Sequence, residues 1–317
     1  MAHMTNPLAT VDQLYRRTSS FGALPSDLQD AIFFATQSLT QAAGLLLRLP
    51  QSVTAQASVV LARFWLVDSI LDHEFSEVSA ASLFAVAKLG AHPCRPRDVS
   101  NVYAYLLSPA SPLFRPPPPP DQTSDPTTYY LSDTAFRAFH TRVLALEARI
   151  LYKLGFDTHV ALPHGLAVTY LQALDFCGDS SKSRITRRVV ALLNTALLSP
   201  QMLYLTHQPN ALAVAAIYSA ARGPDIGARM PECAWWEVFD VDREELGFLV
   251  VGMRSLEGWV RKLQDDIEGF GKSGMITIKH CEKEMRKRGL RVKADGLEAA
   301  MDEEEVMMRE MDERPET

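Results

Sequence analysis

Cysteine and long hydrophobic runs are scarce in this chain of 317 residues, and positive charges are fewer than negative ones. Its four cysteines, Cys94, Cys177, Cys233 and Cys281, lie far apart, so neither a zinc site nor a disulfide framework is indicated, and we expect reduced, mostly buried thiols. Aspartate plus glutamate number 38 against 32 for lysine plus arginine, a net charge of −6. That balance argues against a general electrostatic surface for nucleic acid or for an anionic membrane.

The longest apolar stretches, such as residues 31–34 and 45–47, are far shorter than the roughly 20 residues that cross a bilayer. No charged start followed by an apolar signal region occurs either, so the chain is expected to be soluble and intracellular. The opening Met1 to Met4 has the form of an expression-tag remnant, and residues 1–25 are expected to form an N-terminal segment. Hydrophobic residues make up 47% of the chain, enough for a large core.

Nearly every long segment repeats its apolar residues at spacings of three and four, which is typical of amphipathic helices. In the first half this pattern predicts helices over residues 26–48, 52–73, 76–89, 97–107 and 133–154. In the second half it predicts helices over residues 163–174, 187–205, 211–221 and 243–263. Ser26 is the expected N-cap of the first helix, and no strand pattern of useful length occurs.

Two of these segments, 76–89 and 211–221, are unusually rich in small residues, and they occupy matching places in a repeat. Residues 54–90 align without a gap to residues 185–221, which sets Ser79 against Asn210. Small side chains let neighbouring helices approach closely, so both segments suit the centre of a bundle. The sequence therefore predicts an all-α fold of two tandem five-helix units.

Between the fourth and fifth predicted helices, residues 108–128 contain five consecutive prolines, Pro116 to Pro120. Proline fixes its own φ and donates no backbone hydrogen bond, so this stretch is expected to be an extended polyproline spacer. A docking motif for a partner with an aromatic groove is the alternative.

Catalytic motifs are absent from the sequence. His-Glu-x-x-His and Gly-x-Ser-x-Gly do not occur. Gly271-Lys272-Ser273 ends like a phosphate-binding loop, but Asp266 stands where the first glycine belongs, and a helix precedes the segment instead of a strand. His159 and His164, on either side of Pro163, suit neither a metal pair nor a catalytic triad. We therefore expect no catalytic residue, no metal site and no cofactor.

Four stretches carry a resemblance to a known family. They are Gln41 to Gln51 (QAAGLLLRLPQ), Arg97 to Val102 (RDVSNV), residues 154–172 and residues 208–222. These stretches resemble parts of the L-type cyclins. The first is similar to the exit of their first helix and the second to their fourth helix. The third is similar to the passage into their second cyclin box and the fourth to the third helix of that box. The resemblance implies a first cyclin box over residues 26–157, a second over 158–265 and a charged C-terminal extension over 266–317.

The resemblance also implies a function. Cyclins have no active site of their own; they bind a cyclin-dependent kinase and push its regulatory helix inward, which assembles the kinase for phosphoryl transfer. An L-type cyclin would form a heterodimer with a kinase of transcription or pre-mRNA splicing in the nucleus. By motif, the kinase-binding pair falls on Lys88 and Glu147, and Leu89, Leu151 and Phe156 are the implied apolar contacts.

The C-terminal extension changes from basic to acidic along its length. Seven lysines and arginines between Lys279 and Lys293 could form a nuclear import patch, but Glu282 and Glu284 interleave with them at helical spacing. A plain solvated helix is the alternative, and the resemblance to the L-type cyclins favours the nuclear import patch. Residues 295–317 are strongly acidic, whereas L-type cyclins usually end in an arginine-serine-rich tail.

Three other functional interpretations stay open. Trp235 to Phe239 (WWEVF) is similar to the Q-type, or M-type, cyclins, which would partner a different kinase. Transcription initiation factors also contain two cyclin-like repeats, so the second interpretation is a module that binds nucleic acid or protein. Arg184, Arg187 and Arg188 form a local basic cluster. The net charge of −6 nevertheless argues against direct nucleic-acid binding. An all-α enzyme with an unrecognised site is the third.

Overall fold

The computed structural model describes residues 4–14, 24–115, 129–175, 179–223, 231–267, 270 and 274–290. Within these ranges the chain is helical and contains no strand, so the predicted all-α class is confirmed. None of the helices described there is long and apolar enough to cross a bilayer. The polyproline run, Cys177, the Gly271-Lys272-Ser273 stretch and the acidic C-terminus lie outside the described residues.

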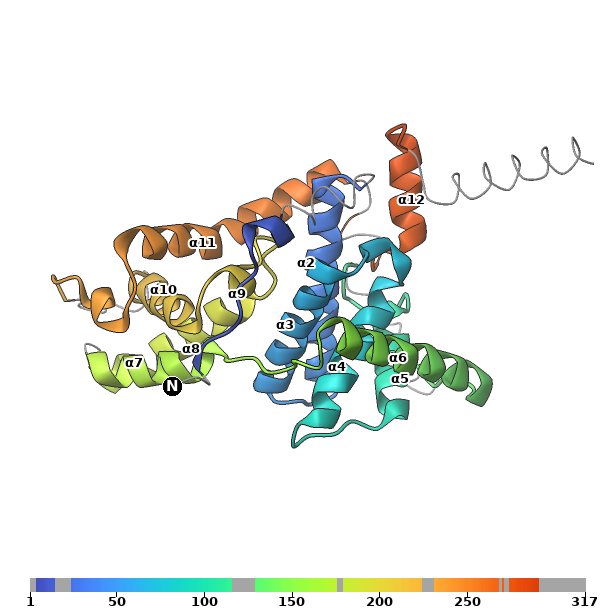
Figure 1. The fold of residues 1–317 in the computed structure, drawn as a ribbon, viewed down its shortest axis with the longest axis horizontal. Coiled ribbons are helices and arrows are strands. Elements are labelled where there is room, and N and C mark those ends of the chain that lie inside the picture. Colours follow the sequence, from blue (N-terminus) through green and yellow to red (C-terminus); the bar gives the residue numbers. More distant parts are fainter. Residues whose placement is uncertain are drawn as a thin grey trace, which may run out of the picture.

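The first half of the chain folds around one central helix, α4 (Phe75–Leu89) (Figure 1). Its neighbours are α2 (Ser26–Leu46), α3 (Gln51–Val67), α5 (Pro96–Leu107) and α6 (Asp133–Lys153), and all four contact α4. A short 3₁₀ helix, η2 (Ile70–Asp72), joins α3 to α4. These elements correspond to the first predicted five-helix unit.

The second half repeats this plan around α10 (Pro209–Ala221). The other elements are α7 (Pro163–Leu174), α8 (Asp179–Ala196), α9 (Leu203–Thr206), η4 (Trp235–Phe239) and α11 (Arg243–Asp266). Contacts join α10 to α7, α8, α11 and η4, so the 3₁₀ helix η4 takes the fourth position of this unit. The two-repeat architecture is thus confirmed, while the boundaries at residues 157 and 265 stay predictions.

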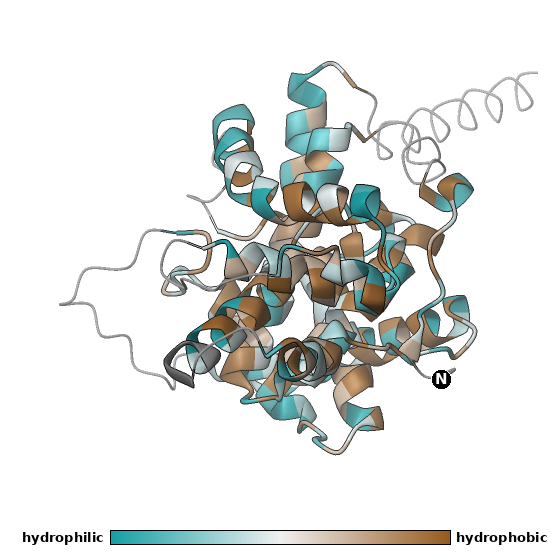
Figure 2. Cartoon of the chain, turned by 90° about the vertical axis from the view of Figure 1, so that its left-hand side faces the viewer, coloured by the Kyte–Doolittle hydropathy of each residue, from teal (hydrophilic) through white to brown (hydrophobic). Residues whose placement is uncertain are grey.

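The small residues explain why α4 and α10 are central. In α4 the residues from Val78 to Ala87 are all buried, and in α10 burial extends over nearly the whole helix. A helix that is apolar and small on every side can be surrounded by neighbours at close distance, because no large or charged side chain needs to reach water. Hydrophobic and hydrophilic residues lie side by side along several of the other helices, in brown and teal in Figure 2, whereas α3 is also buried over most of its length.

The aligned positions Ser79 and Asn210 have equivalent roles. The Ser79 hydroxyl lies 2.7 Å from the hydroxyls of both Thr40 and Tyr103, so it links α4 to α2 and to the fourth helix, α5. The Asn210 side-chain amide donates to the carbonyl of Phe239 at 3.0 Å, which links α10 to the fourth element, η4. Each central helix is therefore tied to its fourth element by a polar side chain at the same place in the repeat.

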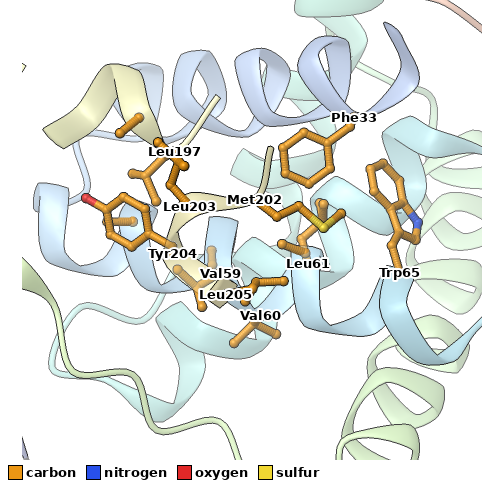
Figure 3. Close-up of a cluster of buried hydrophobic side chains, with 14 of the residues drawn as sticks. Phe33, Val59, Val60, Leu61, Trp65, Leu197, Met202, Leu203, Tyr204 and Leu205 are labelled. Carbon is orange, nitrogen blue, oxygen red and sulfur yellow. The ribbon is translucent and has the colours of Figure 1, made fainter. Parts of the chain in front are cut away.

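The two units share one buried core (Figure 3). Val59, Val60 and Leu61 of α3 face Leu203 and Leu205 of α9, and all five side chains are at most 2% exposed. Burial of this kind stabilises by about 25 cal/mol for each Å² of apolar surface removed from water. The second unit is consequently packed against the first and not merely joined to it.

The predicted helix over residues 187–205 is wrong in its length. α8 ends at Ala196, and the next helix, α9, starts only at Leu203. Pro200 lies between them, and proline cannot donate the backbone hydrogen bond that a helix interior requires. Met202 then adopts a left-handed backbone conformation, with φ 53°, which turns the chain into α9.

Two other predicted helix ends also differ. The helix predicted to reach residue 73 ends at Val67, because Asp68 adopts an extended conformation with φ −132° and ψ 160°. The expected N-cap at Ser26 is wrong as well. Ser26 is already helical, and Pro25 holds the N-cap position with φ −56° and without a side-chain hydrogen bond.

The N-terminal segment is part of the fold. The Asn6 side chain donates to the carbonyl of Ala161 and accepts from its amide, both at 2.8 Å. The Gln208 side chain pairs in the same way with the backbone of Asn6, at 3.0 Å in each direction. These four hydrogen bonds hold the segment against the second unit.

The start of the C-terminal extension returns to the first unit as α12 (Ile278–Lys287), which stands beside α2 (Figure 1). Cys281 and Met285 are fully buried under it, and Arg288 pairs with Asp27 of α2 at 2.8 Å. Lys279 and Lys283 stay exposed on the other face, so the choice between an import patch and a plain solvated face stays a prediction. Thiol burial is less general than expected, since Cys94 is half-buried and Cys233 exposed.

Candidate functional site

The structure brings Lys88 and Glu147 together. The Lys88 Nζ atom, on the last turn of α4, lies 3.1 Å from Oε1 of Glu147 on α6. The two side chains differ sharply in exposure, with 57% of the Lys88 side chain and 8% of the Glu147 side chain open to solvent. The pair is thus a buried carboxylate covered by an ammonium group at the surface.

Local sequence explains this placement. Glu147 lies within the buried stripe of α6, together with Val143, Leu146 and Ile150. Lys88 follows the small-residue core of α4 and occupies its last turn, where a cation interacts favourably with the helix dipole. Its Nζ atom also lies 5.8 Å from the centre of the Phe84 ring, one helical turn earlier.

The predicted apolar contacts lie at the ends of the same two helices. The exposed fractions are 62% for Leu89, which follows Lys88, and 71% for Phe156, just beyond α6, while Leu151 is half-buried. Phe156 adopts φ 62°, a left-handed conformation that costs a non-glycine residue about 1–3 kcal/mol. Its amide donates to the Leu151 carbonyl at 2.8 Å, so the turn holds the aromatic ring at the surface.

Leu144 and Tyr152 belong to the same surface and were missed by the sequence analysis. They are 39% and 77% exposed, and they lie with the exposed Ala148 at intervals of four residues along α6. The sequence signal that could have identified them is a second apolar stripe on this helix, beside the buried stripe. A helix with two apolar stripes can bury one in the core and leave the other for a binding partner. We call Leu89, Leu144, Leu151, Tyr152 and Phe156 the apolar surface of the site.

A second ion pair fixes α6 to the end of α3. The Arg149 guanidinium binds Asp68 with two bonds, Nε to Oδ2 at 2.5 Å and Nη2 to Oδ1 at 2.9 Å, and Lys153 adds a contact at 3.5 Å. Burial raises the pKa of Asp68, but the hydrogen bond and charge of Arg149, with the charge of Lys153, outweigh burial and lower it. The sequence contained no signal for this pair, because the two residues lie far apart in the chain.

The described residues do not form a recognisable catalytic arrangement. No group of three or more histidine, cysteine, aspartate or glutamate side chains among them could hold a metal ion. His164 lies on α7 with its Nε2 atom 2.9 Å from the Asn194 side chain, whereas His159 is exposed in the linker before α7. What the site offers is a charged pair beside exposed apolar side chains, which suits the binding of another protein.

Comparison with curated proteins finds cyclins. The chain is 29% identical to cyclin-L2 of Homo sapiens over 286 residues, which is 90% of this chain and 49% of that protein. It is 32% identical to cyclin-L1 of Homo sapiens over 209 residues, which is 66% of this chain and 36% of that protein. The chain therefore spans about half, or less, of the length of these relatives. No protein-family model matches the sequence.

Comparison with solved structures agrees on the fold. A chain of the yeast RNA polymerase II CTD kinase complex CTDK-1 matches with a TM-score of 0.61 and 13% identity, covering 93% of this chain and 88% of that one. A chain of the CAK complex of Chaetomium thermophilum bound to ATP-gamma-S matches with a TM-score of 0.51 and 16% identity, covering 87% and 85%.

Two tandem helical boxes, each built around a small-residue helix, form the cyclin fold, which the chain shares with these structures. The sequence matches over most of the chain support a cyclin. Among the cyclins it is most like the L type. The relatives reported above are L-type proteins, which agrees with the first resemblance in the sequence and not with the Q or M type.

Proposed function

We propose that the chain is a non-catalytic regulatory subunit that binds and activates a cyclin-dependent kinase as a heterodimer. The observation that carries this proposal is the Lys88–Glu147 pair at 3.1 Å, with the exposed apolar surface around it. The kinase-binding residues are then Lys88, Glu147, Leu89, Leu151 and Phe156, as the sequence implied, with Leu144 and Tyr152 added.

The chemistry of the site supports binding of an amphipathic helix of the kinase. Exposed leucine and aromatic side chains lose their contact with water when a partner covers them, which favours association. Lys88 and Glu147 offer an ammonium and a carboxylate to backbone groups at the edge of such a helix. Fixing the kinase helix in one position would hold the catalytic groups of the kinase in their active arrangement.

The cellular role follows from the relatives and is part of the proposal. An L-type cyclin would act with a kinase of transcription or pre-mRNA splicing, and the structural neighbour CTDK-1 is a kinase complex for RNA polymerase II. We place the protein in the nucleus, where the exposed Lys279, Lys283 and Arg286 on the outer face of α12 would serve in import.

Affinity purification from the native cell followed by mass spectrometry tests the proposal. We expect one cyclin-dependent kinase to be recovered in stoichiometric amount, and the purified kinase to phosphorylate substrate only after the chain is added. A chain with Lys88→Ala and Leu89→Ala together should recover much less kinase. Phosphate transfer by the chain alone, or recovery of nucleic acid without a kinase, would overturn the proposal.

A further inference from the structure

Among the described residues, three arginines from three helices converge on the last turn of α10. Arg222 is the C-cap residue of α10 itself. The Arg254 Nη2 atom, from α11, donates to the Ser219 carbonyl of that turn at 3.4 Å. The guanidinium of Arg188, from α8, packs against Gly223, where a Cβ atom would lie 2.8 Å from its Cζ atom. α10 lies between α8 and α11 (Figure 1), so both neighbours supply a cation to its C-terminal end.

Arginine side chains at this end of α10 are open to solvent. Arg222 and Arg254 are exposed, and so is Arg184, one helical turn before the half-buried Arg188 on α8. The Arg222 guanidinium stacks on the Tyr218 ring, 4.7 Å from the ring centre. Stacking uses the flat face of a guanidinium and leaves the N–H donors at its edge available. We call Arg184, Arg222 and Arg254 the arginine surface.

The charges of the arginine surface are not neutralised within the part of the chain that the structure describes, where none of its three residues forms an ion pair. Glu257, one turn beyond Arg254 on α11, pairs instead with Arg261 at 2.5 Å. The dipole of a helix stabilises a cation at its C-terminal end by about 0.3–1 kcal/mol. That interaction permits the cluster at the end of α10 but leaves its charge available to an anion.

The chemistry of the arginine surface indicates which anion suits it. A phosphate monoester on a protein has about −1.5 to −2 charges near pH 7 and three acceptor oxygens, so more than one guanidinium can donate to it. A single nucleic-acid strand would also need exposed rings on which its bases stack. Tyr218 is half-buried with one face under Arg222, and the half-buried Trp236 contacts it at 6.2 Å in a T-shaped arrangement. This surface therefore offers cations and not rings.

We propose that the arginine surface binds a phosphorylated segment of another protein, with the phosphate of a phosphoserine or phosphothreonine held between Arg222 and Arg254. Arg222, oriented by Tyr218, would donate two bonds to the phosphate, as arginine does to phosphate in many proteins. Arg184 would add a second charge beside it. The arginine surface lies on the second unit, apart from the proposed kinase-binding residues around α4 and α6. The proposal goes beyond kinase activation and does not depend on it.

Fluorescence anisotropy on the full chain tests the proposal. The labelled probe is a short peptide with one phosphoserine between alanines and glycines, compared with its unphosphorylated twin and with an oligouridine of similar length. We expect saturable binding of the phosphopeptide and at least about tenfold weaker binding of the twin, because hydrogen bonds to a charged group are the strong ones. Oligouridine should bind more weakly than the phosphopeptide, since its bases find no exposed ring.

Substitutions of exposed arginines locate the binding. Arg222→Gln and Arg254→Gln should each weaken phosphopeptide binding about tenfold at a nearly unchanged melting temperature, since glutamine lacks the charge and the donor fork. Arg137→Gln is the matched control, because Arg137 is exposed on α6 of the first unit, and it should bind normally. No saturable binding of the phosphopeptide, equal binding of its twin, tighter binding of oligouridine, or full binding by the Arg222→Gln, Arg254→Gln double variant would each overturn the proposal.

Discussion

Lys88 and Glu147 form an ion pair at 3.1 Å in which the two partners are unequally exposed, with 57% of the lysine side chain and 8% of the glutamate side chain in contact with solvent. The free chain therefore already contains the pair that the proposed kinase would contact. The inequality also means that the two residues contribute differently to folding and to binding.

The first prediction uses this inequality. Lys88→Ala leaves the buried Glu147 carboxylate without its partner, so it should lower the free energy of unfolding by about 1–3 kcal/mol. Glu147→Gln leaves an exposed ammonium in water and should cost less. Both should weaken kinase binding, since loss of one partner of an interfacial pair costs about 2–5 kcal/mol. Denaturant unfolding and kinase titration measure the two effects.

The pair Glu77–Arg142 provides a matched control for these variants. It joins the same two helices, α4 and α6, at 2.6 Å, with side-chain exposures of 17% and 53%. Arg142→Ala should therefore lower stability to a similar extent as Lys88→Ala but leave kinase affinity unchanged. Equal losses of affinity in both variants would mean that helix packing, and not the proposed site, controls binding.

The second prediction concerns the exposed aromatic rings. Phe156→Ala and Tyr152→Ala remove side chains that are 71% and 77% exposed, so neither should lower the melting temperature. Each should weaken kinase binding about tenfold or more, as expected of aromatic residues at the centre of an interface. Phe248→Ala on α11, where the ring is 56% exposed, is the control and should bind normally. Normal kinase affinity in the Phe156→Ala and Tyr152→Ala chains would place the interface elsewhere.

The third prediction concerns acid. The pKa of Asp68 is lowered from 3.8 by Arg149 and Lys153 in spite of the opposing effect of burial. The stability that the Asp68 carboxylate contributes is therefore complete above about pH 4, and it is lost as the pH falls through the lowered pKa of the folded state. Asp68→Asn should cost about 1–3 kcal/mol at pH 7. In urea unfolding, the gap between the wild-type and variant chains should narrow below about pH 4; a constant gap would show that its charge is not involved.

The fourth prediction concerns His164. Burial lowers its pKa from 6.5, although the bond to Asn194 opposes this, and its Nδ1 atom is buried without a partner. The folded state thus prefers the neutral ring. This contribution to stability is complete above pH 6.5 and is lost as the pH falls towards the lowered folded pKa.

Replacing the ring tests this assignment. His164→Gln should flatten part of the rise in stability between about pH 5 and 7, measured as melting temperature against pH. Burial also lowers the pKa of His73 and His207, so some dependence on pH should remain in the variant. An unchanged profile would mean that His164 does not titrate in this range.

The fifth prediction separates the two faces of α12. Met285→Ala empties a buried position and should lower the free energy of unfolding by about 2–5 kcal/mol. Lys279→Ala with Lys283→Ala changes only exposed side chains, so stability should stay the same while nuclear accumulation of a fluorescent fusion falls. Nuclear accumulation that stays complete in the double variant would show that this basic face is dispensable for import.

Helical periodicity predicted most elements because it depends only on residues close in sequence. It failed where a local feature interrupted the pattern, as at Pro200 between α8 and α9 and at Asp68 after α3. For the site, the family resemblance indicated Lys88 and Glu147, and the structure brings them together. The exposed Tyr152 was missed, because the helical pattern indicates which residues can be buried and not which apolar residues stay exposed to solvent.

By itself the sequence determined the helical class, the repeat and the two central helices, because the many small residues of α4 and α10 allow neighbouring helices to surround them closely. The tertiary structure alone decided two contacts: Asn6 against Ala161 and Arg149 on Asp68. Each depends on residues that the fold brings together from distant parts of the chain, and side-chain hydrogen bonds of this kind follow no sequence period.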